Sequence, residues 1–375
     1  MSKRDQVQDE GLEIAKVIPR CGLGISMGVG KTFIGLKYLE HFWNENTWRK
    51  ALVVAPKVSI FETWKDEAVK FGIDPAMMVS VTFTTYLSLH KHNPSDYDIV
   101  ILDECHSLLY GHEVFLGAYA GRILGLTGTP PRYIKSEKGQ MVNKYCPVRF
   151  KYITKDAVDD AILNDYRIIV HQLSLSSANT LKQTTKKGAS FYTSEQKSYE
   201  YWTKRIALAS TKKEEQIASI MRMRALMDFK TKEVYAKELL AEMEDKCLVF
   251  ANTQEQAERI CKYAIHSNNP DADKYLDMFK RGKIYEASCV LQLNEGVNIP
   301  GLKAGILLHA YGNERKSAQR IGRLLRLNPT EMATAHILCY KGTVDERWVA
   351  EAIKDLDPSK VSYYDSTQKE EDLFL

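Results

Sequence analysis

The stretch GISMGVGKTFIGL (residues 24–36) decides how the first half of the chain is interpreted. It places Lys31 and Thr32 directly after Gly28 and Gly30, and a pattern typical of a helix follows. Glycines let a backbone approach a phosphate closely, and the start of a helix presents free N–H groups and a positive dipole end to an anion. The strict P-loop pattern, GxxxxGK followed by Ser or Thr, is matched in all but its first glycine, where this chain has isoleucine. The stretch predicts a phosphate-binding loop; the alternative is a glycine-rich turn before a helix.

A second motif, DYDIVILDECH, supports the phosphate loop. It ends an apolar run with two adjacent carboxylates, Asp103 and Glu104. In a nucleotide-hydrolysing site Lys31 reaches the β- and γ-phosphates, while Thr32 and Asp103 hold Mg²⁺. Glu104 can then act as the general base that polarises the attacking water. The alternative is an exposed acidic turn. The two motifs together predict a site for a nucleotide's phosphates and Mg²⁺, and the family resemblance below identifies the nucleotide cofactor as ATP.

Composition limits the class of protein. The chain has 375 residues, 44% hydrophobic and 27% charged, with a net charge of +4, which suits two globular domains and permits a polyanionic partner. Its apolar runs are too short to span a bilayer. Its seven cysteines include no CxxC spacing, which disfavours zinc and iron–sulfur sites. Because no secretory signal is visible, we expect a cytoplasmic protein, of a bacterial or phage-infected cell, with no membrane partner.

Short β-rich runs alternate with helical patterns, which predicts an α/β fold with parallel sheets covered on both faces. The polar stretch 131–160 divides the strands into two groups. We expect a first domain over 1–155, a second over 156–355 with a helical accessory segment at about 180–232, and an acidic C-terminal tail over 356–375. The expected strands are 51–56, 98–103, 122–128, 167–175, 246–252, 287–293 and 304–310.

With DECH in place, the chain resembles a superfamily 2 helicase of the DExH type, and the resemblance runs in order over nearly the whole length. The pattern of Pro56, Trp64 and Glu67 is similar to Swi/Snf-type translocases, and the compact chain also resembles phage recombination (branch-migration) helicases. The stretches that carry the resemblance are SMGVGKT, VVAPKVSIFETWKDE, TFTTYLSL, LDECHSL, LGLTGTPPR, CLVFANTQEQAERI, LNEGVNIPGL and SAQRIGRLLRL, which look like motifs I, Ia, Ib, II, III, IV, V and VI.

The resemblance implies two RecA-like domains that flank an ATP cleft. Arg323 and Arg326 are the candidate arginine fingers, since residues three apart share a helix face. His106, by its DExH position, is expected to couple the ATP site to motif III. The catalytic candidates are Lys31, Asp103, Glu104, Gln319, Arg323 and Arg326. The implied nucleotide contacts are Arg4, Gln6, Met27, Gly28, Val29, Gly30, Lys31, Thr32 and Gly296, with Thr32 and Asp103 on the metal.

For nucleic acid, the resemblance implies phosphate contacts from Lys57, Thr85 and Thr253, which position a strand without reading its bases. The accessory segment interleaves aromatic and basic residues. Such a mixture suits stacking on unpaired bases, or an ordinary helical pair that packs its aromatics inward. The residues concerned are Phe191, Tyr192, Tyr199, Tyr201 and Trp202, with Lys186, Lys187, Lys197, Lys204 and Arg205.

We interpret the chain as an ATP-dependent DNA helicase or translocase that acts on forked, branched or single-stranded DNA, including recombination intermediates. The alternatives are an RNA-dependent ATPase or RNA helicase, the motor subunit of a restriction or repair complex, and a non-catalytic nucleic-acid-binding scaffold. The tail STQKEEDLFL is either a peptide that docks onto a replication or recombination protein, or a solvated disordered end.

Overall fold

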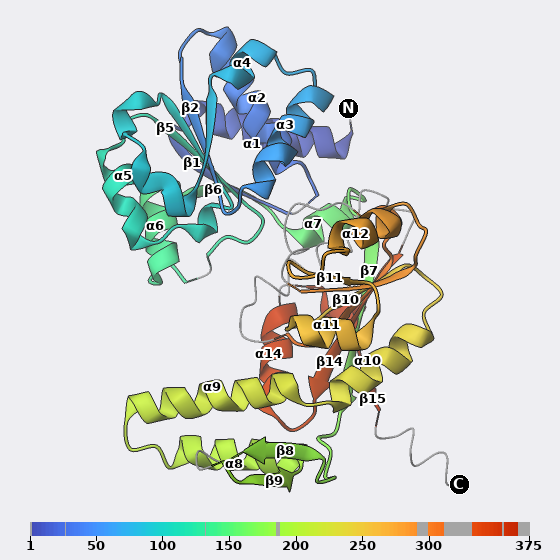
Figure 1. The fold of residues 1–375 in the computed structure, drawn as a ribbon. Helices are drawn as coiled ribbons and strands as arrows, with labels where there is room; N and C mark the ends of the chain where they lie inside the picture. The colour runs from blue at the N-terminus through green and yellow to red at the C-terminus, as the bar shows by residue number, and fades with distance from the viewer. Residues whose placement is uncertain are drawn as a thin grey trace. The chain divides into compact units, whose positions relative to one another are not determined.

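The computed structural model describes residues 2–26, 28–131, 133–184, 188–290, 299–310, 332–354 and 356–366. The chain forms two compact units, the first ending at Asp165 and the second beginning at Tyr166 (Figure 1). The domain boundary expected after residue 155 falls inside a helix of the first unit, Thr154–Asp159.

The first unit is built on a six-stranded parallel sheet in the order β3-β2-β4-β5-β1-β6. Its strands are β1 (Arg20–Ile25), β2 (Ala51–Ala55), β3 (Val81–Thr85), β4 (Ile99–Asp103), β5 (Arg122–Thr127) and β6 (Val148–Tyr152). Its helices are α1 (Lys3–Val17), α2 (Lys31–Asn44), α3 (Ser59–Lys70), α4 (Pro75–Val79), α5 (Glu113–Ala118), α6 (Glu137–Tyr145) and α7 (Thr154–Asp159), with short 3₁₀ turns at Tyr86–Lys91, Pro94–Asp96, Cys105–Ser107 and Tyr110–His112.

The burial of the central strands agrees with a sheet that is covered by helices on both faces. Every residue of β2 (ALVVA) and β4 (IVILD) is buried, as expected for strands covered on both faces. Figure 1 shows α1, α2 and α3 on one side of the sheet and α5 and α6 on the other. Because all six strands are parallel, their carboxyl ends meet at one edge of the sheet, where ligands of such folds bind.

The second unit has a seven-stranded sheet in the order β11-β12-β10-β13-β14-β7-β15, and a separate two-stranded hairpin. Its strands are β7 (Asp165–Leu173), β8 (Leu181–Thr184), β9 (Ser190–Thr193), β10 (Cys247–Phe250), β11 (Ala264–Ile265), β12 (Glu286–Cys289), β13 (Ala304–Leu307), β14 (Met332–Tyr340) and β15 (Val361–Asp365). Its helices are α8 (Glu195–Ala207), α9 (Lys212–Asp228), α10 (Thr231–Ala241), α11 (Gln254–Ile260), α12 (Ala272–Lys280) and α14 (Val344–Ile353), with a 3₁₀ turn at Pro358–Lys360.

The α/β fold with two parallel sheets is confirmed, and each of the seven expected strands corresponds to a strand of the structure. The polar stretch 131–160 belongs to the first unit. It contains α6, β6 and α7, and β6 pairs with β1 at the edge of the first sheet. As an edge strand, β6 buries few of its residues, so its sequence VRFKY lacks the apolar run of a central strand.

Two further expectations are corrected. The segment 180–232 is not wholly helical, because β8 and β9 form an antiparallel hairpin before α8. The run SFYT favours a strand through its aromatic residues, and Gly188, with φ at 86°, lies in the turn. The segment 356–375 is not all tail, because β15 pairs in parallel with β7. The remainder of that tail, 367–375, lies outside the described residues.

Across the described segments, we find no helix that combines the length and the apolar character required to cross a bilayer.

Candidate nucleotide site

The loop between β1 and α2 has the backbone geometry of a phosphate-binding loop. Gly28 and Gly30 have φ values of 85° and 114°, a left-handed region that only glycine enters at little cost. Gly30 is also the N-cap of α2, and Val29 between the two glycines is fully buried. The loop therefore turns tightly and presents the start of a 14-residue helix, as an anion site requires. Met27, expected in this loop, lies outside the described residues.

Helix α1 holds the loop in place. The Arg4 guanidinium donates from Nε to the Val29 carbonyl over 3.0 Å, and Gln8 Nε2 donates to the same carbonyl over 2.6 Å. A Cβ at Gly30 would collide with Gln8 Nε2, so the glycine is needed for this close approach. Gln6, the residue expected at the nucleotide, has an exposed side chain. Residues four apart share a helix face, so Gln8 rather than Gln6 lies on the Arg4 face of α1.

Lys31 joins the loop to the second motif. Its Nζ lies 3.4 Å from the Ile25 carbonyl oxygen and 3.9 Å from Glu104 Oε1, and both charged side chains are largely buried. The lysine therefore spans the loop from within and faces the carboxylate of Glu104. Thr32, the next residue, is partly buried in the first turn of α2.

Asp103 ends β4 and is held by two aromatic side chains. Trp64 Nε1 on α3 donates to Asp103 Oδ2 over 2.9 Å, and the Tyr86 hydroxyl donates to the Asp103 backbone oxygen over 2.9 Å. Burial, and next the neighbouring Glu104 charge, raise the pKa of Asp103 to about 6, which the Trp64 hydrogen bond opposes. Trp64 is itself fully buried against Gly35 of α2. It was noted in the sequence only as part of a motif pattern, whereas the structure makes it the residue that orients this carboxylate.

Glu104 links the loop to the strand end of β5. Its backbone has φ 51° and ψ 53°, an unusual conformation for a residue other than glycine and one that clusters at functional sites. Glu104 Oε2 lies 3.3 Å from His106 Nδ1, which in turn lies 2.8 Å from Thr127 Oγ1 and 3.4 Å from Thr129 Oγ1. A connected chain of polar side chains thus runs from Lys31 to Thr127.

These donors fit magnesium. Mg²⁺ prefers hard oxygen ligands and usually keeps several waters while binding one or two protein groups and the substrate phosphates. The Asp103 carboxylate and the Thr32 hydroxyl are such ligands, and a buried carboxylate with a raised pKa gains from a nearby cation. In the part of the chain that the structure describes, no cluster of three or more His, Cys, Asp or Glu is placed to hold an ion. The ion would therefore depend on phosphate and water ligands as well.

Two of the three expected nucleic-acid contacts lie at or just after the ends of neighbouring strands. Thr85 ends β3 in register with Ala55 of the neighbouring β2, and the exposed Lys57 follows two residues later. Thr253 belongs to the second unit, where its hydroxyl caps α11 by accepting from the Gln256 N–H over 3.2 Å. The remaining predicted site residues lie outside the described residues; they are Gly296, Gln319, Arg323 and Arg326.

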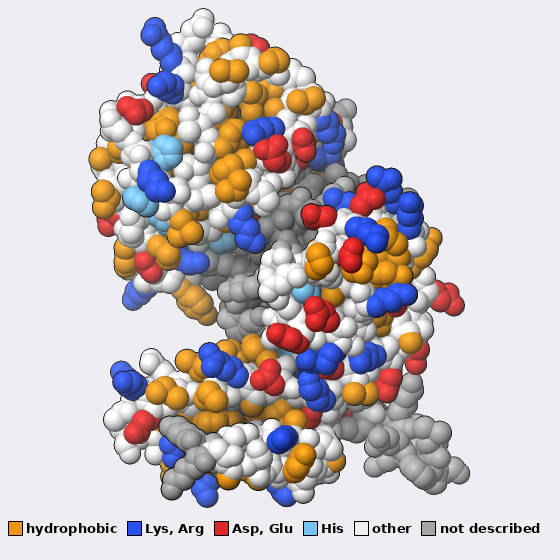
Figure 2. Space-filling model, viewed as in Figure 1, with side chains coloured by type: hydrophobic (Ala, Val, Ile, Leu, Met, Phe, Trp, Pro, Cys, Tyr) orange, Lys and Arg blue, Asp and Glu red, His pale blue; other side chains and the backbone are white. Residues whose placement is uncertain are grey.

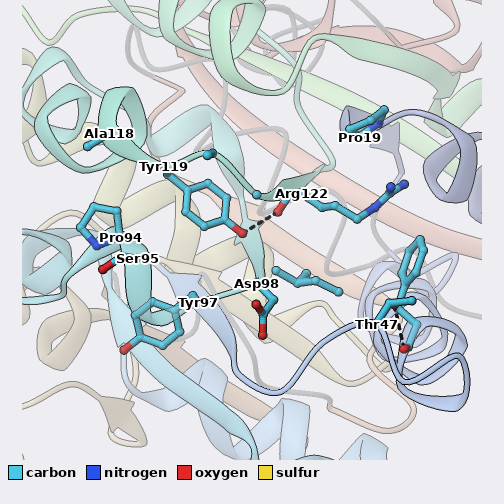
Figure 3. Close-up of a pocket in the computed structure, with 13 residues that line it drawn as sticks. Pro19, Thr47, Pro94, Ser95, Tyr97, Asp98, Ala118, Tyr119 and Arg122 are labelled. Carbon is cyan, nitrogen blue, oxygen red and sulfur yellow. Dashed lines mark hydrogen bonds between the residues drawn. The ribbon is translucent and has the colours of Figure 1, made fainter.

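A hollow of about 640 Å³ occurs at the opposite edge of the first sheet, where β4 and β5 begin (Figure 3). Its polar groups already serve the fold. Asp98 accepts from the backbone N–H groups of Arg49 and Lys50 over 2.8 and 3.1 Å. The Arg122 guanidinium lies 4.4 Å from the ring centre of Phe42. We therefore assign this hollow no part in the nucleotide site.

Two family models match the chain. Residues 19–132 match the model described as type III restriction enzyme, res subunit, and residues 230–328 match the helicase conserved C-terminal domain. The first match contains the phosphate loop and the DECH motif, and the second begins in the second unit, at helix α10. Together with the two parallel sheets, these matches show the tandem RecA-like domains of a superfamily 2 helicase, which imply a nucleic-acid-dependent ATPase.

Among curated proteins, the chain is similar to the DNA 3'-5' translocase XPB2 of Sulfurisphaera tokodaii, with 24% identity over 352 residues that cover 85% of this chain and 77% of that protein.

Three solved structures share the fold at low sequence identity. The type ISP restriction-modification enzyme LlaBIII bound to DNA has a TM-score of 0.62 at 16% identity over 97% of this chain, which spans only 31% of that enzyme. A fragment of a putative HsdR subunit of a type I restriction enzyme from Vibrio vulnificus YJ016 has a TM-score of 0.63 at 17% identity, covering 96% of this chain and 68% of that one. The Pyrococcus furiosus Hef helicase domain has a TM-score of 0.51 at 16% identity, covering 93% and 98%.

Proposed function

We propose that this protein is an ATP-driven DNA translocase or helicase. The observation that carries the proposal is a connected set of side chains at the phosphate loop. Lys31 contacts Glu104, Glu104 contacts His106, and the buried Asp103 adjoins Glu104. A scaffold protein that had lost its motor activity would have no need to keep a buried lysine, two adjacent carboxylates and a strained backbone in this arrangement.

Each group has a role in hydrolysis. The loop N–H groups and Lys31 bind the phosphates and offset their charge. Asp103 and Thr32 would hold Mg²⁺, which neutralises charge that develops on the β- and γ-phosphate oxygens. Glu104 orients the attacking water and accepts its proton. His106 fixes the position of the Glu104 carboxylate and connects it to Thr127 at the end of β5.

DNA is the polymer we favour. The similar archaeal protein is named a DNA translocase, and one of the similar structures was solved with DNA bound. Lys57 and Thr85 would contact backbone phosphates without reading sequence, and their positions at or just after the ends of the neighbouring strands β2 and β3 support this role. Forked, branched or recombination substrates, and a protein partner bound through the C-terminal tail, are further parts of this proposal.

A second candidate is the motor subunit of a restriction or repair complex. It is favoured by the match of residues 19–132 to a restriction-enzyme model and by the shared fold with two restriction enzymes. In that case a nuclease should co-purify with the chain from its native cell, whereas a free motor should be isolated alone.

The main test is ATP turnover with single-stranded DNA, blunt duplex, forked DNA and single-stranded RNA of matched sequence. We expect Mg²⁺-dependent hydrolysis that DNA stimulates at least several-fold more than RNA does, and that Lys31→Ala abolishes. Greater stimulation by RNA would favour the RNA helicase alternative. Hydrolysis that no nucleic acid changes would contradict the proposal.

A further inference from the structure

Residues 181–228, which we call the arm, concentrate the positive charge of the molecule. They comprise the hairpin β8–β9 and helices α8 and α9. The arm carries ten Lys and Arg against five Asp and Glu, a net charge of +5, whereas the whole chain carries +4. The rest of the chain is therefore close to neutral. Figure 2 shows Lys and Arg side chains over α8 and α9, with hydrophobic surface between them.

The base of the arm is firmly attached to the second unit. Glu195, at the start of α8, is buried, and its carboxylate accepts from the backbone N–H groups of Lys230 and Thr231 over 2.8 and 3.1 Å. The backbone N–H of Val344 donates to the Tyr199 hydroxyl over 2.9 Å. A buried carboxylate with several donors fixes the direction of the helix, so the outer surface of the arm is built on a rigid support.

One face of α8 presents an aromatic ring among cations. Tyr201 is 56% exposed, and Lys197, Lys204 and Arg205 lie one turn away on the same face. The half-buried Trp202 meets the Tyr201 ring edge to face, with ring centres 5.0 Å apart, which holds the ring in position.

The hairpin repeats this arrangement. Tyr192 is 65% exposed and pairs across the strands with Lys182, so both side chains project from the same face of the hairpin. Gln183, on the opposite face, donates from Nε2 to the Ser198 hydroxyl of α8 over 3.1 Å and so joins the hairpin to the helix. Tyr199 and Trp202 are half-buried, as in a helical pair that packs its aromatics inward, while Tyr192 and Tyr201 remain exposed.

From these observations we infer that the arm binds an unpaired DNA strand, with Tyr192 and Tyr201 stacking on bases and Lys182, Lys197, Lys204 and Arg205 contacting phosphates. The inference rests on the proposed function. An unpaired strand offers the two features this surface matches, a line of negative charges and open base faces. A duplex offers the charges but hides the base faces in its stack, so it would leave the two tyrosine rings without a partner.

The test uses the full chain and two variants of exposed residues. Tyr192→Ala/Tyr201→Ala removes the rings, and Lys197→Gln/Lys204→Gln/Arg205→Gln removes charges. The matched control is Tyr285→Ala/Tyr363→Ala, which removes two equally exposed tyrosines elsewhere in the second unit. Binding of a fluorescent oligothymidylate of about 30 nucleotides is measured by anisotropy without ATP, in parallel with ATP turnover and thermal unfolding.

We expect the ring variant to bind the oligonucleotide about tenfold more weakly or worse, with basal ATPase and unfolding temperature unchanged. The charge variant should lower the slope of log affinity against log salt by about 2, at roughly 0.7 per phosphate contact on a single strand. Affinity for a blunt duplex should fall less in the ring variant.

The two proposals fail in different ways. If DNA stimulates the wild-type ATPase but both arm variants bind the oligonucleotide as the wild type does, the arm inference is wrong and the proposed function stands. An equal loss in the Tyr285 and Tyr363 control would also overturn the arm inference. If no nucleic acid changes the wild-type ATPase, the proposed function fails whatever the arm binds.

Discussion

Glu104 combines an unusual backbone conformation with a central position among the polar side chains of the candidate site. It has left-handed backbone angles, and its carboxylate lies between Lys31 and His106. We predict that Glu104→Gln lowers ATP turnover by about 10²- to 10⁴-fold, because glutamine keeps the shape but cannot accept the proton. Nucleotide affinity and the unfolding temperature should change little. Unchanged turnover, basal and stimulated, would show that another group is the base.

Trp64 tunes the carboxylate that we assign to the metal. Burial and the Glu104 charge raise the pKa of Asp103 to about 6, and the Trp64 hydrogen bond opposes that rise. In Trp64→Phe the pKa of Asp103 should rise further, so protons compete better with Mg²⁺. We predict that the Mg²⁺ concentration for half-maximal turnover increases several-fold at pH 6.5 and much less at pH 8.5. An equal increase at both pH values would point to altered packing against Gly35 instead.

At the scale of single residues, the sequence predicts the site residues that lie in short motifs. It does not predict the residues that reach the site through tertiary contacts. Lys31, Asp103 and Glu104 lie in short motifs from which their chemical roles can be predicted. The structure brings all three together. Gln8 and Trp64 act through contacts with residues 21 and 39 positions away. Only the four-residue spacing from Arg4 could have favoured Gln8 over Gln6 in advance.

Among the elements, most central strands were predictable, whereas the edge strands were not; the central strands β1 and β14 are absent from the expected set. Every residue of the central strands β2 and β4 is buried, whereas Tyr152 is the one fully buried residue of the edge strands β6 and β15. Strand β1 is central but contains two glycines. A Cβ at Gly22 would collide with the Cys146 carbonyl. The backbone near Cys146 comes so close that the strand has glycine there instead of a β-branched residue.

Strands β7 and β14 place two buried histidines in contact. His171 Nε2 lies 2.9 Å from His336 Nδ1, and burial lowers the pKa of both rings to about 4, helped for His171 by the neighbouring His336. Well above pH 6.5 both rings are neutral in the folded and the unfolded state, so their protonation does not change stability with pH there. As the pH falls from 6.5 to 4, these histidines become protonated in the unfolded state but stay neutral in the folded state. The free energy of unfolding therefore decreases by up to about 1.4 kcal/mol per pH unit per histidine.

We therefore predict that the thermal unfolding midpoint decreases as the pH is lowered from 6.5 to 4.5. In His171→Phe/His336→Leu this decrease should be smaller. Thermal melts of both proteins across that range provide the measurement. The quantity to compare is the slope of the unfolding temperature against pH in each protein. The midpoints themselves are not comparable, because the variant loses the hydrogen bond to Tyr235 and starts from a lower midpoint. Parallel slopes would mean that other groups control acid sensitivity.

At the scale of the whole molecule, the chemistry proposed for the motor comes from two separate regions of the sequence. The first unit contains the phosphate loop, Asp103 and Glu104. The candidates for neutralising the transition state, Arg323 and Arg326, come late in the sequence, in the stretch QRIGRLLR. A motor needs such a division, because hydrolysis that depends on groups from two domains can be coupled to their relative movement.

This division leads to a prediction about Arg323→Ala/Arg326→Ala. An arginine finger stabilises charge on the transferring phosphoryl group far more than charge on bound ATP, so turnover should fall by about a thousandfold while nucleotide affinity falls much less. Stimulation by DNA should disappear with it. Arg347→Ala, at an exposed position of α14, is the matched control and should leave turnover intact. Single-turnover hydrolysis and binding of a fluorescent ATP analogue separate the two effects. If the double variant keeps stimulated turnover, the first unit hydrolyses ATP without guanidinium help, and coupling must use another contact.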